Sequence, residues 1–235
     1  MRKISEVFVN GVSLEKILED HEKWLNGENG GERADLSDAD LRDVDLIGAN
    51  LSDIDLIGAN LSGANLRSVN LSDTILFGAN LSDTDLRNAN LSNTNLSYTD
   101  LGYADLSDAN LNNADLSDAN LRCADLSYTN LRCSYLSYTD LRNTDLSYAN
   151  LNNADLSGAD LRFTDLNNAD LRDTDLSCVN LIDADLNCAD LTNADLTNAD
   201  LTNADLRFAD LRDTNLNNTN LTNADLSDAD LNDIN

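Results

Sequence analysis

Leucine recurs at every fifth residue from Leu36 to Leu231 without interruption, which places 40 leucines in one register. Leucines at this spacing would rotate by about 140° per step around an α-helix, and they would alternate between the two faces of a straight strand. Neither regular element can therefore bury all of them. One way to keep every leucine inside is to bend the chain once per five residues, always in the same sense. The pattern predicts an all-β solenoid whose unit is a short strand followed by a turn.

The other positions of the repeat support this unit. The residue two before each leucine is always small or β-branched: the 41 such positions hold 24 Ala, 11 Thr, 3 Val, 2 Ile and Ser134. Residues two apart share a strand face, so this residue and the leucine both point inward. Between them stands an outward Asp or Asn, except at Ile75 and Tyr135. The inward threonine hydroxyls need partners, which backbone carbonyls or other threonines would supply.

The repeats A-D-L-S-D, A-N-L-S-G, A-D-L-R-F and A-D-L-T-N resemble the pentapeptide-repeat family, whose motif is A-(D/N)-L-x-x. The resemblance covers residues 34–235. It implies a right-handed quadrilateral β-helix with four pentapeptides per coil and hence about ten coils. At a strand spacing of about 4.8 Å, the rod would be about 50 Å long.

Residues twenty apart give weak independent support for four sides, because they would stack on one face of such a coil. Like residues recur at this spacing: Arg122, Arg142 and Arg162, and also Tyr128 and Tyr148. The two exceptions to the Asp/Asn rule, Ile75 and Tyr135, lie 60 residues apart, which a three-sided coil would also place on one face. The residues alone therefore leave a triangle open.

Residues 1–33 lack the repeat and predict an N-terminal cap. The pair Asn10-Gly11 follows a short apolar segment and indicates a strand or a hairpin. Ser13 is a candidate N-cap for an amphipathic helix over 13–26, which a glycine-rich joint connects to the first coil. Because a solenoid end exposes unpaired backbone, we expect this helix to lie over the first coil and residues 34–235 to form the β-helix.

His21 is the only histidine, and it stands beside Asp20 and Glu22. A catalytic base is one interpretation, but no candidate nucleophile accompanies it, so a histidine on the surface of the cap is favoured. Trp24 is expected to anchor the cap. Since the sequence shows no nucleophile–base pair, phosphate loop or metal-ligand cluster, we expect no enzymatic activity, no cofactor and no metal.

The net charge of −28 narrows the classes of partner. Residues 34–235 hold 36 acids, all Asp, and 10 bases, all Arg, so the rod alone carries −26. Such a field disfavours direct binding to nucleic acid and favours basic partners. The chain shows neither the apolar run of a signal peptide nor a stretch of transmembrane length.

Four cysteines, Cys123, Cys133, Cys178 and Cys188, all stand two residues after a leucine. In a four-sided coil the members of each neighbouring pair point to opposite sides, so we expect neither an internal disulfide nor a shared metal ion. Exposed free thiols indicate a reducing compartment, and we expect the protein to be cytoplasmic.

Two stretches are candidate binding surfaces. Ile57, Ile75 and Phe77 predict a small apolar stripe, either a partner site or, as the favoured interpretation, a docking surface for residues 1–12. The larger candidate protein-interaction surface combines the six tyrosines with nearby arginines, because both residue types are common interface anchors. It consists of Tyr98, Tyr103, Tyr128, Tyr135, Tyr138, Tyr148, Arg122, Arg142 and Arg162. The alternative is that these tyrosines merely stack on the neighbouring coil.

These observations favour a non-catalytic acidic scaffold that binds an unidentified protein, as a monomer or an end-to-end homodimer. The resemblance also implies an alternative, because some family members are acidic dimeric rods that occupy the DNA-binding saddle of type II topoisomerases such as DNA gyrase. Members of that kind carry loops between coils and a C-terminal dimerisation module, both of which this sequence lacks. A third hypothesis is Ca²⁺ binding by stacked carboxylates such as Asp185 and Asp205.

Overall fold

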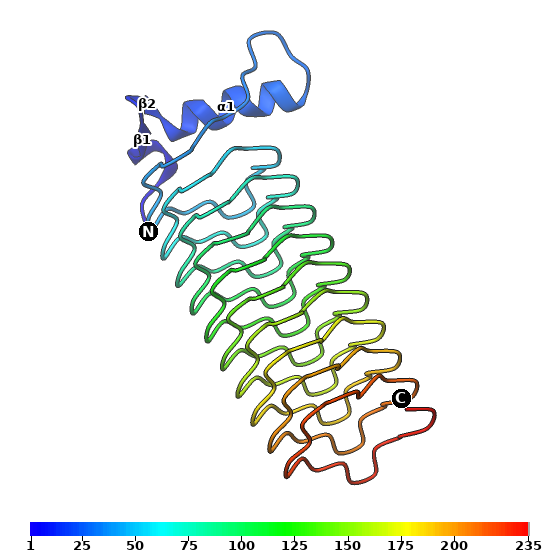
Figure 1. Cartoon of the computed structure of the whole chain (residues 1–235). Helices are drawn as coiled ribbons and strands as arrows, with labels where there is room; N and C mark the ends of the chain where they lie inside the picture. Colours follow the sequence, from blue (N-terminus) through cyan, green and yellow to red (C-terminus); the bar gives the residue numbers. More distant parts are fainter. Residues whose placement is uncertain (235) are drawn as a thin grey trace.

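The structure, a computed structural model, describes residues 1–234 as a rod of stacked coils with the N-terminal segment at one end (Figure 1). Within the rod, each parallel bridge joins the residue before a leucine to the residue twenty positions later, from Asp35 with Asp55 to Asp210 with Asp230. Twenty residues, or four pentapeptides, therefore return the chain to the same side. The coil has four sides, and the triangular alternative is wrong.

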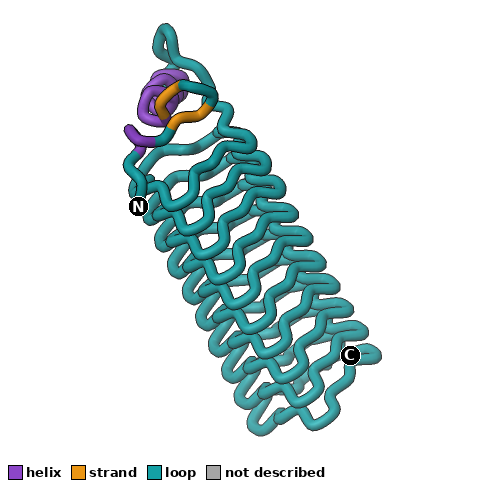
Figure 2. Tube along the Cα trace, turned by 90° about the vertical axis from the view of Figure 1, so that its left-hand side faces the viewer, coloured by secondary structure: helices purple, strands orange, loops and turns teal. Residues whose placement is uncertain are grey.

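Backbone hydrogen bonds between coils run along every side. The amide of Leu96 donates to the carbonyl of Asp115 on the next coil at 2.6 Å, and the amide of Asn95 donates to Thr74 on the previous coil at 3.0 Å. Each strand is so short that most of the chain is drawn as loop and turn in Figure 2. Proline has no amide to donate to such a ladder, and the sequence contains none.

The corners of the coils are β-turns that begin at each leucine. The amide three residues later donates back to the leucine carbonyl, as from Ala109 to Leu106 at 2.9 Å. The second residue after each leucine has a positive φ, near 60° at Asp108. Asn, Asp and Gly tolerate this conformation, but twelve corners hold Ser, Tyr, Cys or Phe, such as Tyr128. Each of these has a backbone cost of about 1–2 kcal/mol, which the flanking ladders must offset.

The core is a single stack of leucines with small residues beside them, and the leucines of the inner coils are completely buried. The inward threonines are satisfied as predicted, by carbonyls. The hydroxyl of Thr74 donates to Leu51 on the previous coil at 2.9 Å, whereas that of Thr84 donates to Leu81 at 2.6 Å. Among the described residues, no buried side-chain nitrogen or oxygen lacks a hydrogen-bond partner.

The outward Asp or Asn before each leucine also has a backbone role. Its side-chain oxygen accepts a hydrogen bond from the amide two residues later, as from Ser127 to Asp125 at 2.9 Å and from Asn112 to Asn110 at 3.2 Å. This local bond fixes the start of the corner. A carboxylate and an amide oxygen serve equally well, so the fold uses an acceptor at this position in all repeats except those of Ile75 and Tyr135, and it does not demand a charge.

The N-terminal segment contains four short elements. They are the 3₁₀ helix η1 (Ile4–Glu6), the strands β1 (Phe8–Val9) and β2 (Val12–Ser13), and the helix α1 (Leu14–Leu25). The strands pair antiparallel around the turn at Asn10-Gly11. Ser13 caps α1 by accepting a hydrogen bond from the amide of Lys16. Lys23 in the last turn suits the negative end of the helix dipole.

This segment continues the ladder of the first coil. Arg2 forms a parallel bridge with Val44, donating to the carbonyl of Asp43 at 2.6 Å and accepting from the amide of Asp45 at 2.9 Å. Val7 and Leu14 are completely buried against the first coil as part of the same core. The segment thus supplies both hydrogen bonds and apolar side chains to the open end of the rod.

His21 is 0% exposed, so the prediction of a surface histidine is wrong. The amide of Ala34 donates to its Nδ1 at 3.2 Å, and its Nε2 lies 2.8 Å from the carbonyl of Ser52. Because an amide only donates and a carbonyl only accepts, Nδ1 carries no proton and Nε2 carries one. The histidine therefore joins α1 to two sides of the first coil. Trp24 stacks on its ring at 5.5 Å.

The apolar stripe is not covered by residues 1–12, contrary to the favoured expectation. Ile57 and Phe77 are 39% and 44% exposed. The hairpin instead buries Val7 and Val9 at the end of the rod. The open first coil offers unpaired backbone as well as apolar area, so it is the better docking surface for this segment.

Candidate interaction surfaces of the rod

We first consider metal binding, cysteine chemistry and membrane insertion for the described residues. In residues 1–234, no three His, Cys, Asp or Glu side chains gather in an arrangement that would hold a metal ion. All four cysteines are free, and Cys123 and Cys133 lie at opposite corners. No described helix has both the length and the apolar character needed to cross a membrane.

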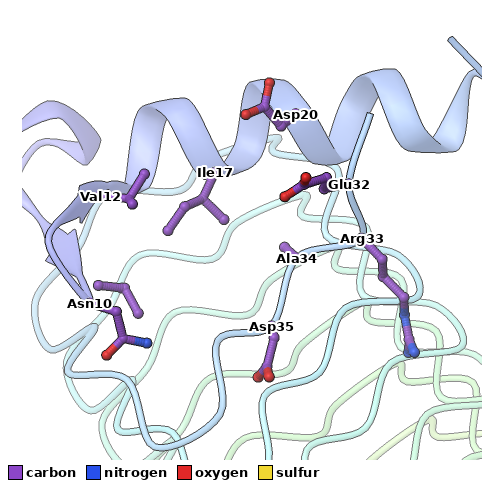
Figure 3. A pocket seen from close by; sticks show the side chains of 9 residues that line it. Asn10, Val12, Ile17, Asp20, Glu32, Arg33, Ala34 and Asp35 are labelled. Atoms are coloured by element: carbon purple, nitrogen blue, oxygen red, sulfur yellow. The ribbon is translucent and has the colours of Figure 1, made fainter. Parts of the chain in front are cut away.

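A cleft of about 300 Å³ lies between α1 and the first coil (Figure 3). Ile17 and Ala34 line it together with acidic groups such as Asp20 and Asp35. Its one basic side chain, Arg33, donates through Nε to the backbone carbonyl of Asp53. The side chain of Asp20 instead binds Lys16 and Lys23 of its own helix, and that of Asp35 binds Ser37 of its own repeat. The polar groups of the cleft do not converge on a common point (Figure 3).

Most arginines of the rod bind an aspartate two residues earlier. Arg142 donates from Nε to Oδ1 of Asp140 at 2.7 Å and from Nη2 to Oδ2, and its Nε also lies 3.6 Å from Asp160 on the next coil. The hydrogen bonds from the guanidinium hold the pKa of Asp140 below its usual value. The same pairing within one coil occurs at Arg42, Arg87, Arg142, Arg162, Arg172, Arg207 and Arg212.

The predicted Tyr/Arg surface is divided among three corners of the rod, because each pentapeptide step moves the chain to the next corner. We call residues at twenty-residue spacing a column. One corner and its adjoining face carry Tyr98, Tyr135 and Tyr138; the next corner carries Tyr103, Arg122, Arg142 and Arg162; and the third carries Tyr128 and Tyr148. The nine residues therefore do not form one continuous surface. Arg142 and Arg162 are also occupied by ion pairs with their own aspartates.

Some of these tyrosines do stack on neighbouring coils. The rings of Tyr128 and Tyr148 are parallel, with centroids 4.9 Å apart. The ring of Tyr138 lies over Gly158, where an added Cβ would come within 2.7 Å of ring atom Cε1. Gly158 thus makes room for the tyrosine of the preceding coil.

One face of the rod is a continuous row of carboxylates. We call it the aspartate face, and it carries eight aspartates on successive coils: Asp85, Asp105, Asp125, Asp145, Asp165, Asp185, Asp205 and Asp225. Arg87 and Arg207 form ion pairs near the two ends of this row. The four middle aspartates have no ion pair with a described residue, and each accepts a backbone amide at 2.9 Å.

The neighbouring face begins with a row of amides. We call it the asparagine face, and it carries Asn50, Asn70, Asn90, Asn110, Asn130 and Asn150 before it changes to aspartate at Asp170. Nδ2 of Asn70 donates to Oδ1 of Asn50 at 3.0 Å, and the pattern repeats from Asn130 to Asn110 at 2.9 Å. Asn70, Asn90 and Asn110 each accept from one neighbour and donate to the other, so this part of the row stabilises itself.

Comparison with known proteins agrees with the repeat. A model described as pentapeptide repeats matches eight copies, over residues 34–73, 74–113, 103–137, 134–173, 174–207 and 199–235. No curated protein matches the chain.

Several solved structures are similar to this chain. HetL, a pentapeptide repeat protein involved in heterocyst differentiation regulation from the cyanobacterium Nostoc, is 35% identical, with 89% of this chain and 92% of HetL covered and a TM-score of 0.36. QnrB1, a plasmid-mediated fluoroquinolone resistance protein, is 17% identical over 86% of this chain and 88% of QnrB1, with a TM-score of 0.39. Rfr23 from Cyanothece is 30% identical over 57% of this chain and 62% of Rfr23, with a TM-score of 0.28.

Proposed function

Since the chain belongs to the pentapeptide-repeat family, whose members fold as right-handed β-helices, we propose that it is a non-catalytic rod that binds basic surfaces of other proteins. The observation that carries this proposal is the choice of aspartate where asparagine would suffice. The position before the leucine holds 24 Asp and 14 Asn, although both supply the same acceptor to the corner. Another 12 Asp stand two residues after a leucine, where asparagine also fits the positive φ.

This choice has an electrostatic cost. Carboxylates of the aspartate face repeat at the coil spacing of about 4.8 Å, where two like charges repel by roughly 1 kcal/mol even in water. A sequence selected for stability alone would place asparagine at these positions, as it does on the asparagine face. The retained charge therefore supports a role in attracting positively charged partners.

The test replaces charge without changing shape. In the variant Asp125→Asn, Asp145→Asn, Asp165→Asn, Asp185→Asn, every side chain keeps the oxygen that accepts the backbone amide. We expect the fold to remain and the salt-sensitive capture of basic proteins from a cell extract to fall. The matched control, Ser107→Thr, Ser127→Thr, Ser147→Thr, changes the same side of the rod without changing its charge. Equal capture by wild type and the aspartate variant contradicts the proposal.

A second candidate function is DNA mimicry, and the linear charge density favours it. A net charge of −26 over about ten coils corresponds to roughly one negative charge per 1.8 Å of rod, compared with about 1.7 Å for duplex DNA. A basic groove that binds DNA through its phosphates would therefore meet a similar density of charge here. DNA gyrase is the partner of this kind that the sequence resemblance suggests.

A supercoiling assay tests this candidate. The protein is titrated into DNA gyrase at low and moderate salt, beside an unrelated protein of equal acidity. Mimicry predicts salt-sensitive inhibition well beyond the control, and a gradual loss of inhibition as Asp→Asn changes accumulate on any face. Absence of inhibition at micromolar concentration would exclude gyrase as the target.

Two structural roles belong to the same proposal. Residues 1–33 act as the cap of the first coil, which the Arg2 bridge and the two His21 hydrogen bonds support. The rod works in a reducing, cytoplasmic environment, which the four free cysteines support. A protein without residues 1–33 is expected to aggregate through the first coil, and light scattering of the shortened chain measures this.

A further inference from the structure

One edge of the rod differs from the others in the side chains that it exposes. It consists of the outward residues around the leucines of the column that runs from Leu36 to Leu216, and we call it the Phe77 edge. Its large apolar and aromatic residues are Ile57, Ile75, Phe77, Tyr98, Tyr135 and Tyr138. Phe77 is 44% exposed and Tyr98 is 59% exposed. Ile57, Ile75, Phe77 and Tyr98 lie on three consecutive coils and form an apolar patch. Asp115 and Asp118 occupy the next coil, and Tyr135 and Tyr138 follow on the coil beyond it.

The centre of this edge is open to a partner. Phe77 and Tyr98 contact each other, with ring centroids 5.4 Å apart and planes inclined by 58°. Beside Phe77 stands Gly78, where an added Cβ would find nothing within 4 Å. The surface at Gly78 is therefore open space next to the exposed ring of Phe77. The nearby carboxylate of Asp118 raises the pKa of Tyr98 through hydrogen bonding.

The Phe77 edge is also the one edge of the rod that has no positive charge. All ten arginines of residues 34–235 stand in the first position of the other three corners. The edge instead carries aspartates on both sides of its apolar centre, such as Asp55 toward the N-terminal end and Asp115 toward the C-terminal end. Neither of these two carboxylates has an ion pair with a described residue, so each is available to an incoming cation.

Most backbone amides of this edge are unavailable to an added strand. The amide of Ile75 donates to Ile54 at 3.2 Å, that of Leu76 to Asn95 at 2.8 Å and that of Gly78 to Ser97 at 3.1 Å. These groups point along the rod axis and are satisfied by adjacent coils. A partner must therefore use its side chains, and an amphipathic helix presents several of them on one face.

We propose that the Phe77 edge docks a basic amphipathic helix of a partner protein. The apolar side chains of the helix lie on Phe77 and Tyr98, and the Lys or Arg side chains of the helix reach Asp55 and Asp115. Asp55, Ile75, Asn95 and Asp115 are bridged in succession, so the two carboxylates lie three coil steps apart. That distance is about 14 Å, which two to three helical turns span. The inference rests on the proposed protein-binding function and gives it a site and a partner chemistry.

The probe is a short fluorescent helical peptide with leucines on one face and lysines on both sides of that face. A second peptide has the same composition in scrambled order, so it keeps the charge and loses the apolar face. The edge variant is Phe77→Ser, Tyr98→Asn, which installs residues that already occupy these positions in the same column at Ser97 and Asn198. The matched control, Tyr128→Asn, Tyr148→Asn, removes two equally exposed rings from another corner.

We expect the ordered peptide to bind wild type and the control with equal Kd, and the edge variant about tenfold more weakly. The scrambled peptide should bind all three proteins alike, through charge alone. Equal affinity of both peptides for wild type overturns the proposed site but leaves the acidic rod as a binder of basic surfaces. If neither peptide binds at low salt, the proposed function fails as well. Equal weakening in the edge variant and the control also overturns the site.

Discussion

The aspartate face and the asparagine face lie side by side on the same backbone and use the same corner geometry. On one, Asn90 donates to Asn70 at 3.0 Å and accepts from Asn110 at 3.1 Å. On the other, Asp145 has carboxylates above and below it at one coil spacing and accepts only a backbone amide. The difference shows that the acceptor oxygen belongs to the fold, whereas the charge is an addition that the fold does not need.

The two faces should therefore respond in opposite directions to the same chemical exchange. Turning amides into carboxylates on the asparagine face breaks hydrogen bonds and adds repulsion. Turning carboxylates into amides on the aspartate face removes repulsion and supplies amide groups that can donate hydrogen bonds to the side chains of neighbouring coils. Each exchange replaces one terminal NH₂ by O⁻ or the reverse, so changes in packing are small.

The largest effect is expected from Asn90→Asp, Asn110→Asp. This variant loses two amide donors and brings carboxylate oxygens against Asn70 and against each other. At about 1 kcal/mol for each lost hydrogen bond, the free energy of unfolding should fall by roughly 2 kcal/mol. Urea denaturation followed by circular dichroism measures this. An unchanged midpoint would show that the amide ladder contributes nothing to stability.

A smaller effect of opposite sign is expected from Asp145→Asn, Asp165→Asn. Both side chains keep the oxygen that accepts the corner amide, and two like charges leave the middle of the row. The exchange removes three neighbouring pairs of like charges in the row. At the low end of about 0.2–1 kcal/mol per pair, which suits exposed carboxylates screened by salt, stability should rise by about 0.6 kcal/mol. The same denaturation experiment applies, and a lower midpoint than wild type would contradict the repulsion argument.

Salt should distinguish the faces without a large change in stability. Moderate salt shortens the range of electrostatic interactions to below 10 Å, which weakens repulsion along the aspartate face. The melting temperature of the wild type should therefore rise with salt. The variant Asp125→Asn, Asp145→Asn, Asp165→Asn, Asp185→Asn should show a smaller rise. Parallel curves for the two proteins would place the repulsion elsewhere on the rod.

Much of this architecture could be predicted from the sequence, because a five-residue register leaves few ways to bury every leucine. The inward threonines and the need for a capped first coil follow from the same register. The repeat family supplied the number of sides, which the bridges between Asp35 and Asp55 and their equivalents now show directly. A strict period makes the local environment of each position nearly the same, so one repeat predicts the next.

The features that sequence reasoning missed are of two kinds. Some are set by single contacts between distant residues, and others by which residues share a corner at twenty-residue spacing. The burial of His21 depends on two backbone groups, at Ala34 and Ser52, which lie far apart in the sequence and offer no pattern. The tyrosines were grouped by their closeness along the chain, although each five-residue step turns to another corner. The positive φ that all corners share was also missed, although frequent Asn, Asp and Gly at that position are its signal.

The ion pairs between aspartate and arginine could also have been predicted from the sequence. Seven of the ten arginines of the rod occur in the triplet D-L-R, and all seven bind their own aspartate. The other three, Arg67, Arg122 and Arg132, follow N-L and have no ion pair with a described residue. In the triplet D-L-R the leucine points inward, so the aspartate and the arginine both point outward and lie side by side on the surface of the rod. The identity of the residue before the leucine, Asp or Asn, therefore separates paired from unpaired arginines.

These pairs give the smallest predicted effect, a dependence of stability on acidity. Hydrogen bonds from Arg142 and Arg172 lower the folded-state pKa of Asp140 and Asp170 below the usual value of 3.8. A lowered pKa contributes stability that is fully present above the unfolded pKa and is lost as the pH falls through the folded one. Because protonation also relieves repulsion along the aspartate face, the prediction concerns the difference between proteins. Below about pH 3.8 the melting temperature of wild type should decrease relative to that of Arg142→Ser, Arg172→Ser. The difference should be small because both pairs are partly exposed to solvent.

Thermal melts between pH 2 and pH 6 measure this difference in melting temperature. The matched control is Arg122→Ser, Arg132→Ser. A control curve that flattens as much as that of the test variant would show that ion pairing is not the cause.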